Sequence, residues 1–180
     1  KEERRACLTI SLAQKNEQGT KLRAIIEKAN KSFGHFDLML CDSLNRFNLA
    51  VEYGVSLRQA EGLALQMGDD WIKKNGSYLN YLALPGKIIR WNEWRSNREL
   101  IPLLEQVQLL VRNKQSCLQV FKSAALDYYK RKKLTPTKEA VDLSIQYLIE
   151  ECAVIVLWAR EGYNFELYPS TRNPAISYIL

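Results

Sequence analysis

Tyr147 and Glu151 are two residues whose types and spacing could do chemistry. They stand four residues apart in a predicted helix, so their side chains lie on one face. Neighbouring positions of this helix are apolar, which predicts a partly desolvated carboxyl group at Glu151. Such a group accepts hydrogen bonds from an ammonium and, with a raised pKa, transfers a proton. Taken alone, the pair is more typical of an ordinary helix flank.

Ser11 is the candidate nucleophile, because it ends the β-prone segment 6–11. A serine at a strand end more often forms a turn or a cap. His35 is the only histidine of the chain and lies in a predicted surface turn, so a Ser-His-Asp triad has little support. A serine that attacks an already activated ester needs less assistance, and aminoacyl-tRNA is such an ester.

The four cysteines indicate buried thiols rather than a redox or metal site. They form no CxxC pair, and Cys7, Cys41 and Cys152 lie in apolar runs. A zinc site built on several histidines is excluded by the single histidine. We therefore expect no bound metal.

The predicted elements place Ser11 at the edge of a parallel sheet. Buried strands are expected at 6–11 and 36–41, with a helix at 21–31 between them, and this alternation is typical of an α/β fold with a mainly parallel sheet. Ser11 and Asp42 would then meet at the carboxyl edge, where functional groups gather. Further elements are expected as a helix at 57–74 capped by Ser56, a strand at 87–91, one or two helices over 100–129, a helix from 137 to 158, and a strand at 163–167.

Composition describes a globular chain with an excess of positive charge. Its 180 residues are 47% hydrophobic and 26% charged, and we expect them to form a single domain, with an N-terminal segment of the protein missing. The net charge of +6 favours a polyanionic partner such as nucleic acid, although a basic soluble domain explains it equally well. The longest apolar run, 152–158, is too short to span a bilayer, so we expect no membrane partner and a cytoplasmic location.

Taken in order, these pieces resemble the cyclodipeptide synthase family. The pattern is a strand ending in serine, a strand followed by aspartate, Tyr-x-x-x-Glu on a late helix and then Tyr-Pro; here it occupies 6–11, 36–42, 147–151 and 168–169. Gln14, three residues after the serine, and Pro169, after Tyr168, resemble the subgroup with Tyr-Pro and a residue other than asparagine at the first marker position.

The resemblance implies a Rossmann-like three-layer α/β fold, similar to the catalytic domain of class I tyrosyl- and tryptophanyl-tRNA synthetases. It implies a monomeric aminoacyltransferase of secondary metabolism that joins the aminoacyl groups of two aminoacyl-tRNAs into a 2,5-diketopiperazine. The expected mechanism is ping-pong through an acyl-serine, without ATP, metal or another cofactor.

The same resemblance assigns roles to individual residues. Ser11 carries the acyl group, Tyr147 and Glu151 hold its amino group, and Tyr168 positions the dipeptidyl intermediate and assists cyclisation. Lys73 and Lys74 match a pair that contacts tRNA, and the basic run 130–133 is a second candidate that is more simply explained as a solvated helix end. The aminoacyl pockets are expected to be lined by Cys7, Thr9 (where the family commonly has glycine), Met39, Cys41 and Val154 for the first residue, and by Gln14, Ile155 and Pro169 for the second.

Two other interpretations were weighed. An aminoacyl-tRNA synthetase fragment has no support, because no HIGH-like or KMSKS-like motif is present. A non-catalytic tRNA- or RNA-binding Rossmann-like module is the alternative; it would keep the basic residues but would not need Ser11, Tyr147, Glu151 and Tyr168 together.

Overall fold

The centre of the fold is a parallel sheet. A computed structural model describes residues 5–168 and 173–180, except 13–16, 34 and 84. All three strand pairings are parallel, as predicted, and the strand order is β3-β2-β1-β4. Almost every residue of the two central strands is buried, because helices cover both faces of the sheet. The strands are β1 (Arg5–Ile10), β2 (His35–Leu40), β3 (Ile88–Arg90) and β4 (Phe165–Leu167).

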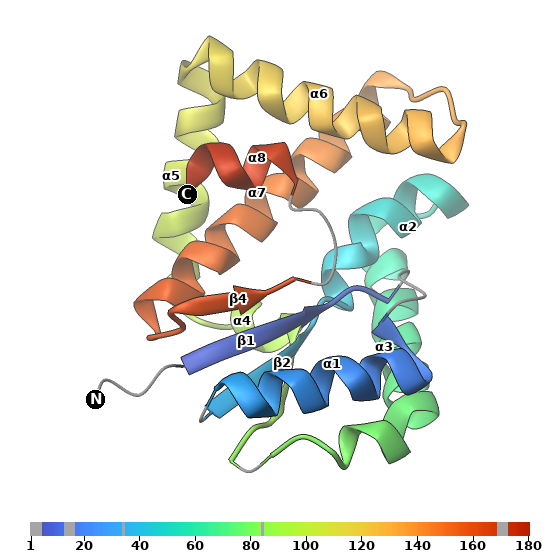
Figure 1. The fold of residues 1–180 in the computed structure, drawn as a ribbon. Helices are drawn as coiled ribbons and strands as arrows, with labels where there is room; N and C mark the ends of the chain where they lie inside the picture. Colours follow the sequence, from blue (N-terminus) through green and yellow to red (C-terminus); the bar gives the residue numbers. More distant parts are fainter. Residues whose placement is uncertain (1–4, 13–16, 34, 84, 169–172) are drawn as a thin grey trace.

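Helices form the two outer layers, which confirms the predicted Rossmann-like three-layer class (Figure 1). On one face, α1 (Gly19–Ser32) and α3 (Leu57–Leu79) pack Leu22, Ile26 and Trp71 onto the sheet. On the other face lies the larger core, centred on the long helix α7 (Lys138–Arg160). Around α7 stand α2 (Arg46–Tyr53), α4 (Trp91–Arg95), α5 (Leu100–Asn113), α6 (Gln115–Lys132) and α8 (Pro174–Ile179).

Local capping explains where the long helices begin. The hydroxyl of Ser56 accepts a bond from the N–H of Gln59, and the side chain of Gln59 accepts one from the N–H of Ser56, which forms a capping box. At the start of α7, the hydroxyl of Thr137 accepts a hydrogen bond from the N–H of Ala140. The helix capped by Ser56 was predicted to end at residue 74, which was wrong, since α3 continues to Leu79.

The region 100–129, expected as one helix or two, forms two helices divided at Lys114, whose backbone is extended, and the second continues to Lys132. One other boundary differs from the prediction. Trp91 was expected to end a strand but instead begins α4, because the N–H of Arg90 is capped by the carboxylate of Glu93. Helices α2, α4 and α8 are short and were not predicted.

A carboxylate fixes the chain where β2 ends. Asp42 is fully buried and accepts hydrogen bonds from the N–H of Ser43 at 2.7 Å and the Nε of Arg90 at 2.5 Å. Helix α3 approaches this group so closely that a Cβ on Gly68 would lie 2.6 Å from the Oδ2 of Asp42. Glycine is therefore required at the point where α3 crosses the strand end.

A buried ion pair joins α2 to α7. Arg46 donates to both carboxylate oxygens of Glu150, at 2.9 and 2.5 Å, and the indole N–H of Trp91 donates to the same group at 2.8 Å. Both charged side chains are more than nine-tenths buried. The pair therefore anchors α7 one residue before Glu151.

All four cysteines are free and buried, as the sequence predicted. Within the described residues, no helix is long and apolar enough to cross a bilayer. No group of three or more metal-ligating side chains is found in that part of the chain either.

Candidate active site

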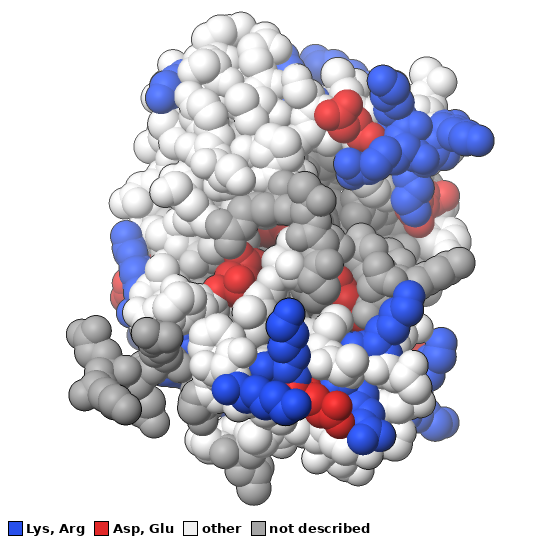
Figure 2. Space-filling model, in the orientation of Figure 1, with Lys and Arg blue, Asp and Glu red and all other residues white. Residues whose placement is uncertain are grey.

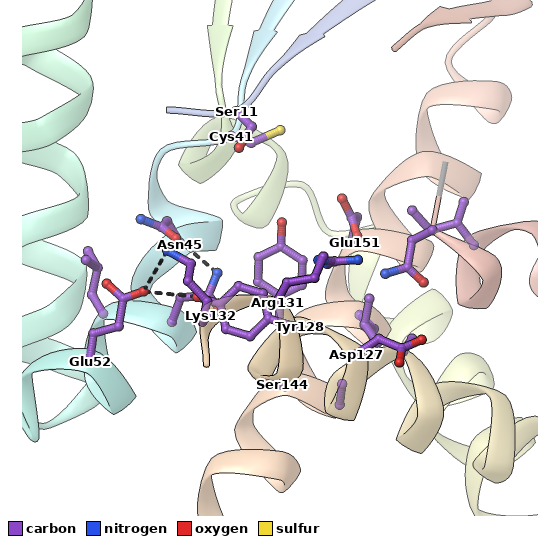
Figure 3. Close-up of a pocket in the computed structure, with 18 of the residues that line it drawn as sticks. Ser11, Cys41, Asn45, Glu52, Asp127, Tyr128, Arg131, Lys132, Ser144 and Glu151 are labelled. Atoms are coloured by element: carbon purple, nitrogen blue, oxygen red, sulfur yellow. Dashed lines mark hydrogen bonds and ion pairs between the residues drawn. The ribbon is translucent and has the colours of Figure 1, made fainter. Parts of the chain in front are cut away.

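A cavity of about 840 Å³ opens at the carboxyl edge of the sheet. Ser11 and Cys41 reach it from the ends of β1 and β2, and Tyr147 and Glu151 reach it from α7. Figure 3 shows Ser11 and Cys41 together at the strand ends, with Glu151 on the facing helix. Tyr168, just beyond β4, completes the set. The structure thus brings together in one cavity the four residues expected to be catalytic.

Burial changes the protonation of these groups. Burial, and to a smaller extent the negative charge of Glu166, raise the pKa of Glu151 to about 8. Burial, and then the charge of Glu151, also raise the pKa of the Tyr147 and Tyr168 hydroxyls well above the ordinary value. At neutral pH the tyrosines are therefore hydrogen-bond donors, and Glu151 is largely protonated. A cation placed beside Glu151 would restore its carboxylate form.

The expected aminoacyl-pocket residues are divided by the structure. Cys41 lines the cavity. Thr9 is buried on β1 and donates its hydroxyl to the Oε1 of Glu166 at 3.1 Å. The pocket residues Gln14 and Pro169 lie outside the described residues. Four others are packed in the core behind the cavity and are not among its described lining residues: Cys7, Met39, Val154 and Ile155.

One wall of the cavity comes from helices that sequence reasoning did not connect to the site. The α2 residues Asn48 and Glu52 line it, together with Tyr128 and Lys132 of α6. The Tyr128 hydroxyl donates to the Oε1 of Glu52 at 3.0 Å, and the Lys132 Nζ lies 3.5 Å from the same oxygen. Figure 3 shows this group across the cavity from Ser11. The only signal for it in the sequence is the basic run 130–133.

Charged side chains of both signs lie around the cavity. Figure 2 shows acidic atoms inside a hollow in the middle of this face and basic side chains on either side of it. Arg131 and Lys132, at the end of α6, line the opening. Lys73 and Lys74 are exposed on α3, outside the described cavity lining, and the Lys74 Nζ donates to the Oε1 of Gln18 at 3.1 Å.

Glu17 is a further carboxyl group next to Ser11 that sequence reasoning missed. It is fully buried, and its Oε2 accepts a hydrogen bond from the N–H of Ser11 at 2.5 Å. Its Oε1 has no hydrogen-bond partner among the described residues. Burial raises the pKa of Glu17 to about 7, although the bond from Ser11 opposes that rise. A glutamate in a polar connection carries no periodic signal that predicts this contact.

The arrangement defines a Rossmann-like protein with a serine, a carboxyl group and two tyrosines in one cavity at the carboxyl edge of its sheet. No family model and no curated protein sequence matches the chain.

Comparison with solved structures places this fold among cyclodipeptide synthases. A cyclodipeptide synthase from Fluoribacter dumoffii is 28% identical, with a TM-score of 0.91 over 98% of this chain and 81% of that one. A cyclodipeptide synthase from Candidatus Glomeribacter gigasporarum, bound to Phe-tRNA(Phe), is 18% identical, with a TM-score of 0.75 over 97% and 80%. A Mycobacterium tuberculosis protein is 16% identical, with a TM-score of 0.67 over 84% of this chain and 66% of that one; its structure demonstrates that cyclodipeptide synthetases are related to type I tRNA synthetases. These likenesses support the cyclodipeptide synthase family for this chain.

Proposed function

We propose that this protein is a cyclodipeptide synthase, an aminoacyltransferase that takes aminoacyl groups from two aminoacyl-tRNAs and releases a 2,5-diketopiperazine. The observation that carries the proposal is the single cavity lined by Ser11, Tyr147, Glu151 and Tyr168. The likeness to cyclodipeptide synthases, one of them bound to Phe-tRNA(Phe), supports it. A non-catalytic RNA-binding module would not need these four side chains together.

In the first step the Ser11 hydroxyl attacks the ester carbonyl of an aminoacyl-tRNA. The new Ser11 ester forms as the bond to the tRNA ribose oxygen breaks, and the serine proton leaves with the tRNA hydroxyl. The reaction exchanges one ester for another, so it requires no ATP. The leaving ribose oxygen can receive the serine proton, so this step does not require a separate base.

In the second step the amino group of the held residue attacks the ester of the second aminoacyl-tRNA. Tyr147 and Glu151 hold that amino group, and the ammonium lowers the pKa of Glu151, which then accepts its proton. An amide bond forms and the second tRNA leaves. The amino group of the resulting dipeptide then attacks the Ser11 ester, the ring is released and the serine hydroxyl is regenerated. Tyr168 positions the dipeptide for this closure.

Binding of tRNA depends on basic side chains of α3 and of the end of α6. Lys73 and Lys74 are proposed to contact the phosphate backbone, which supplies affinity rather than sequence choice. The opening beside Arg131 and Lys132 supports the basic end of α6 as a second contact. This proposal includes the pocket roles of Cys41 and of the seven other residues expected to line the aminoacyl pockets. It also includes the Tyr-Pro subgroup, the monomeric state and the single domain.

The test is to mix the protein with a complete set of charged tRNAs and to search for diketopiperazines by mass spectrometry. We expect product from wild type, and we expect Ser11→Ala to abolish both product and labelling of the protein by radioactive aminoacyl-tRNA. Wild type that forms no product with any pair would exclude the enzyme. Labelling that persists in Ser11→Ala would identify another nucleophile.

A further inference from the structure

A buried carboxyl group, that of Glu17, lies between β1 and α1 and contacts the backbone of Ser11. Glu17 lies six residues after Ser11, and the 2.5 Å bond from the Ser11 N–H to its Oε2 is shorter than the ~2.7–3.2 Å usual for an N–H···O bond. None of the Glu17 surface is exposed. The contact therefore restrains Ser11 where β1 has already ended, at a position that no strand pairing holds.

The start of α1, two residues after Glu17, is hydrogen-bonded to α3. Gly19, at the start of α1, donates its N–H to the Oδ1 of Asn75 at 2.9 Å, and Asn75 donates to the carbonyl of Trp71 at 2.9 Å. The backbone of Gly19 has φ of +61°, a left-handed conformation that favours glycine. Asn75 is buried on α3, so it ties the beginning of α1 to the helix behind it. The backbone two residues after Glu17 is therefore attached to α3.

Folding alone does not account for a carboxyl group at this position. A buried carboxyl group is costly when its hydrogen bonds are incomplete, and the Oε1 of Glu17 has no partner in the described part of the chain. The raised pKa of Glu17 expresses that cost. Ser11 is only half-buried and lines the cavity, so water could satisfy its N–H without any side chain. The free-energy cost of burying the Glu17 carboxyl group is explained if its contact holds Ser11 in position.

We propose that Glu17 is a positioning residue, whose carboxyl group fixes the backbone of Ser11 and so directs the serine hydroxyl into the cavity. The inference rests on the proposed function of Ser11 as the acyl-accepting nucleophile. Glu17 acts through Ser11 and does not touch the substrate. Attack on an ester depends on the approach of the nucleophile, and a displacement of about 1 Å costs on the order of 100-fold in rate.

Two substitutions separate the hydrogen bond from the burial. Glu17→Met keeps the length and removes the acceptor, and we expect it to lower kcat for diketopiperazine formation by about 100-fold with little change in KM for tRNA. Glu17→Gln keeps an acceptor oxygen, and we expect it to lose no more than about tenfold in kcat. Glu27→Met is the matched control on the exposed face of α1 and should leave kcat unchanged. Glu17→Met with wild-type kcat, or equal losses in the Met and Gln variants, would overturn the proposal.

A measurement that needs no activity keeps this inference separate from the proposed function. In a ¹H–¹⁵N spectrum the short bond should move the Ser11 amide proton downfield and slow its exchange with solvent. Both features should persist in Glu17→Gln and disappear in Glu17→Met. A wild-type Ser11 amide without them refutes the bond, even if the variants do not fold. If these features are present but wild type makes no diketopiperazine, the proposed function fails while the Glu17 contact stands.

Discussion

Glu151→Gln tests the electrostatics of the cavity through the stability of the protein. The pKa of Glu151 is raised from its ordinary value of 4.5 to about 8 by burial and by the charge of Glu166. The folded protein therefore binds this proton more tightly than the unfolded chain does. The stabilisation is complete below pH 4.5 and is lost as the pH rises through about 8.

The magnitude follows from the size of the shift. Each pH unit between those two values lowers the free energy of unfolding by up to about 1.4 kcal/mol, which amounts to roughly 4–5 kcal/mol over the interval. This is an upper figure, because Glu151 is half-buried and water in the cavity screens its charge. Glutamine stays neutral at every pH, so the variant lacks this contribution.

The assay is urea unfolding of wild type and Glu151→Gln at pH 5, 6.5 and 8. We expect the stability of the variant relative to wild type to rise between pH 5 and pH 8, by at most about 3–4 kcal/mol. The raised pKa of Glu17 acts in both proteins and cancels in the difference. Parallel pH dependences of the two proteins would refute a raised pKa at Glu151. In the proposed reaction the same variant should lose about 10²- to 10⁴-fold in kcat, because it cannot accept a proton.

Two further predictions concern the tRNA surface and the ion pair behind the site. Replacement of both Lys73 and Lys74 by alanine should raise KM for aminoacyl-tRNA and reduce its salt dependence; an unchanged salt slope would exclude this face of α3. Arg46→Met should lower the free energy of unfolding by about 3–5 kcal/mol in urea titrations, because it removes the cation that pairs with both oxygens of the buried Glu150 carboxylate. The Trp91 indole and Arg95, 3.8 Å away, are the remaining partners of that carboxylate among the described residues. A loss below about 1 kcal/mol would show that the pair is open to water.

Local patterns in the sequence were enough to predict the central elements, and the resemblance of their order to a known family named four residues that the structure brings into one cavity. Alternation of apolar strands with amphipathic helices predicted the parallel sheet and put Ser11 at its carboxyl edge. The spacing of four residues put Tyr147 and Glu151 on one face of α7, because a helix turn has a fixed period. The short helices α2, α4 and α8 escaped prediction, since their few turns carry too little periodicity.

Contacts between distant segments could be decided only by the tertiary structure. The sequence suggested that Cys7, Met39 and Val154 line a pocket; the structure buries all three in the core between the sheet and α7, and they are not among the described residues that line the cavity. Nothing local indicates that the carboxyl group of Glu17 reaches the backbone of Ser11. Residue types and helical period are properties of a short segment, whereas burial, pKa and hydrogen-bond partners depend on what the rest of the chain packs against it. The sequence by itself therefore named the candidate chemistry, and the tertiary structure decided which groups share a cavity and in which protonation state.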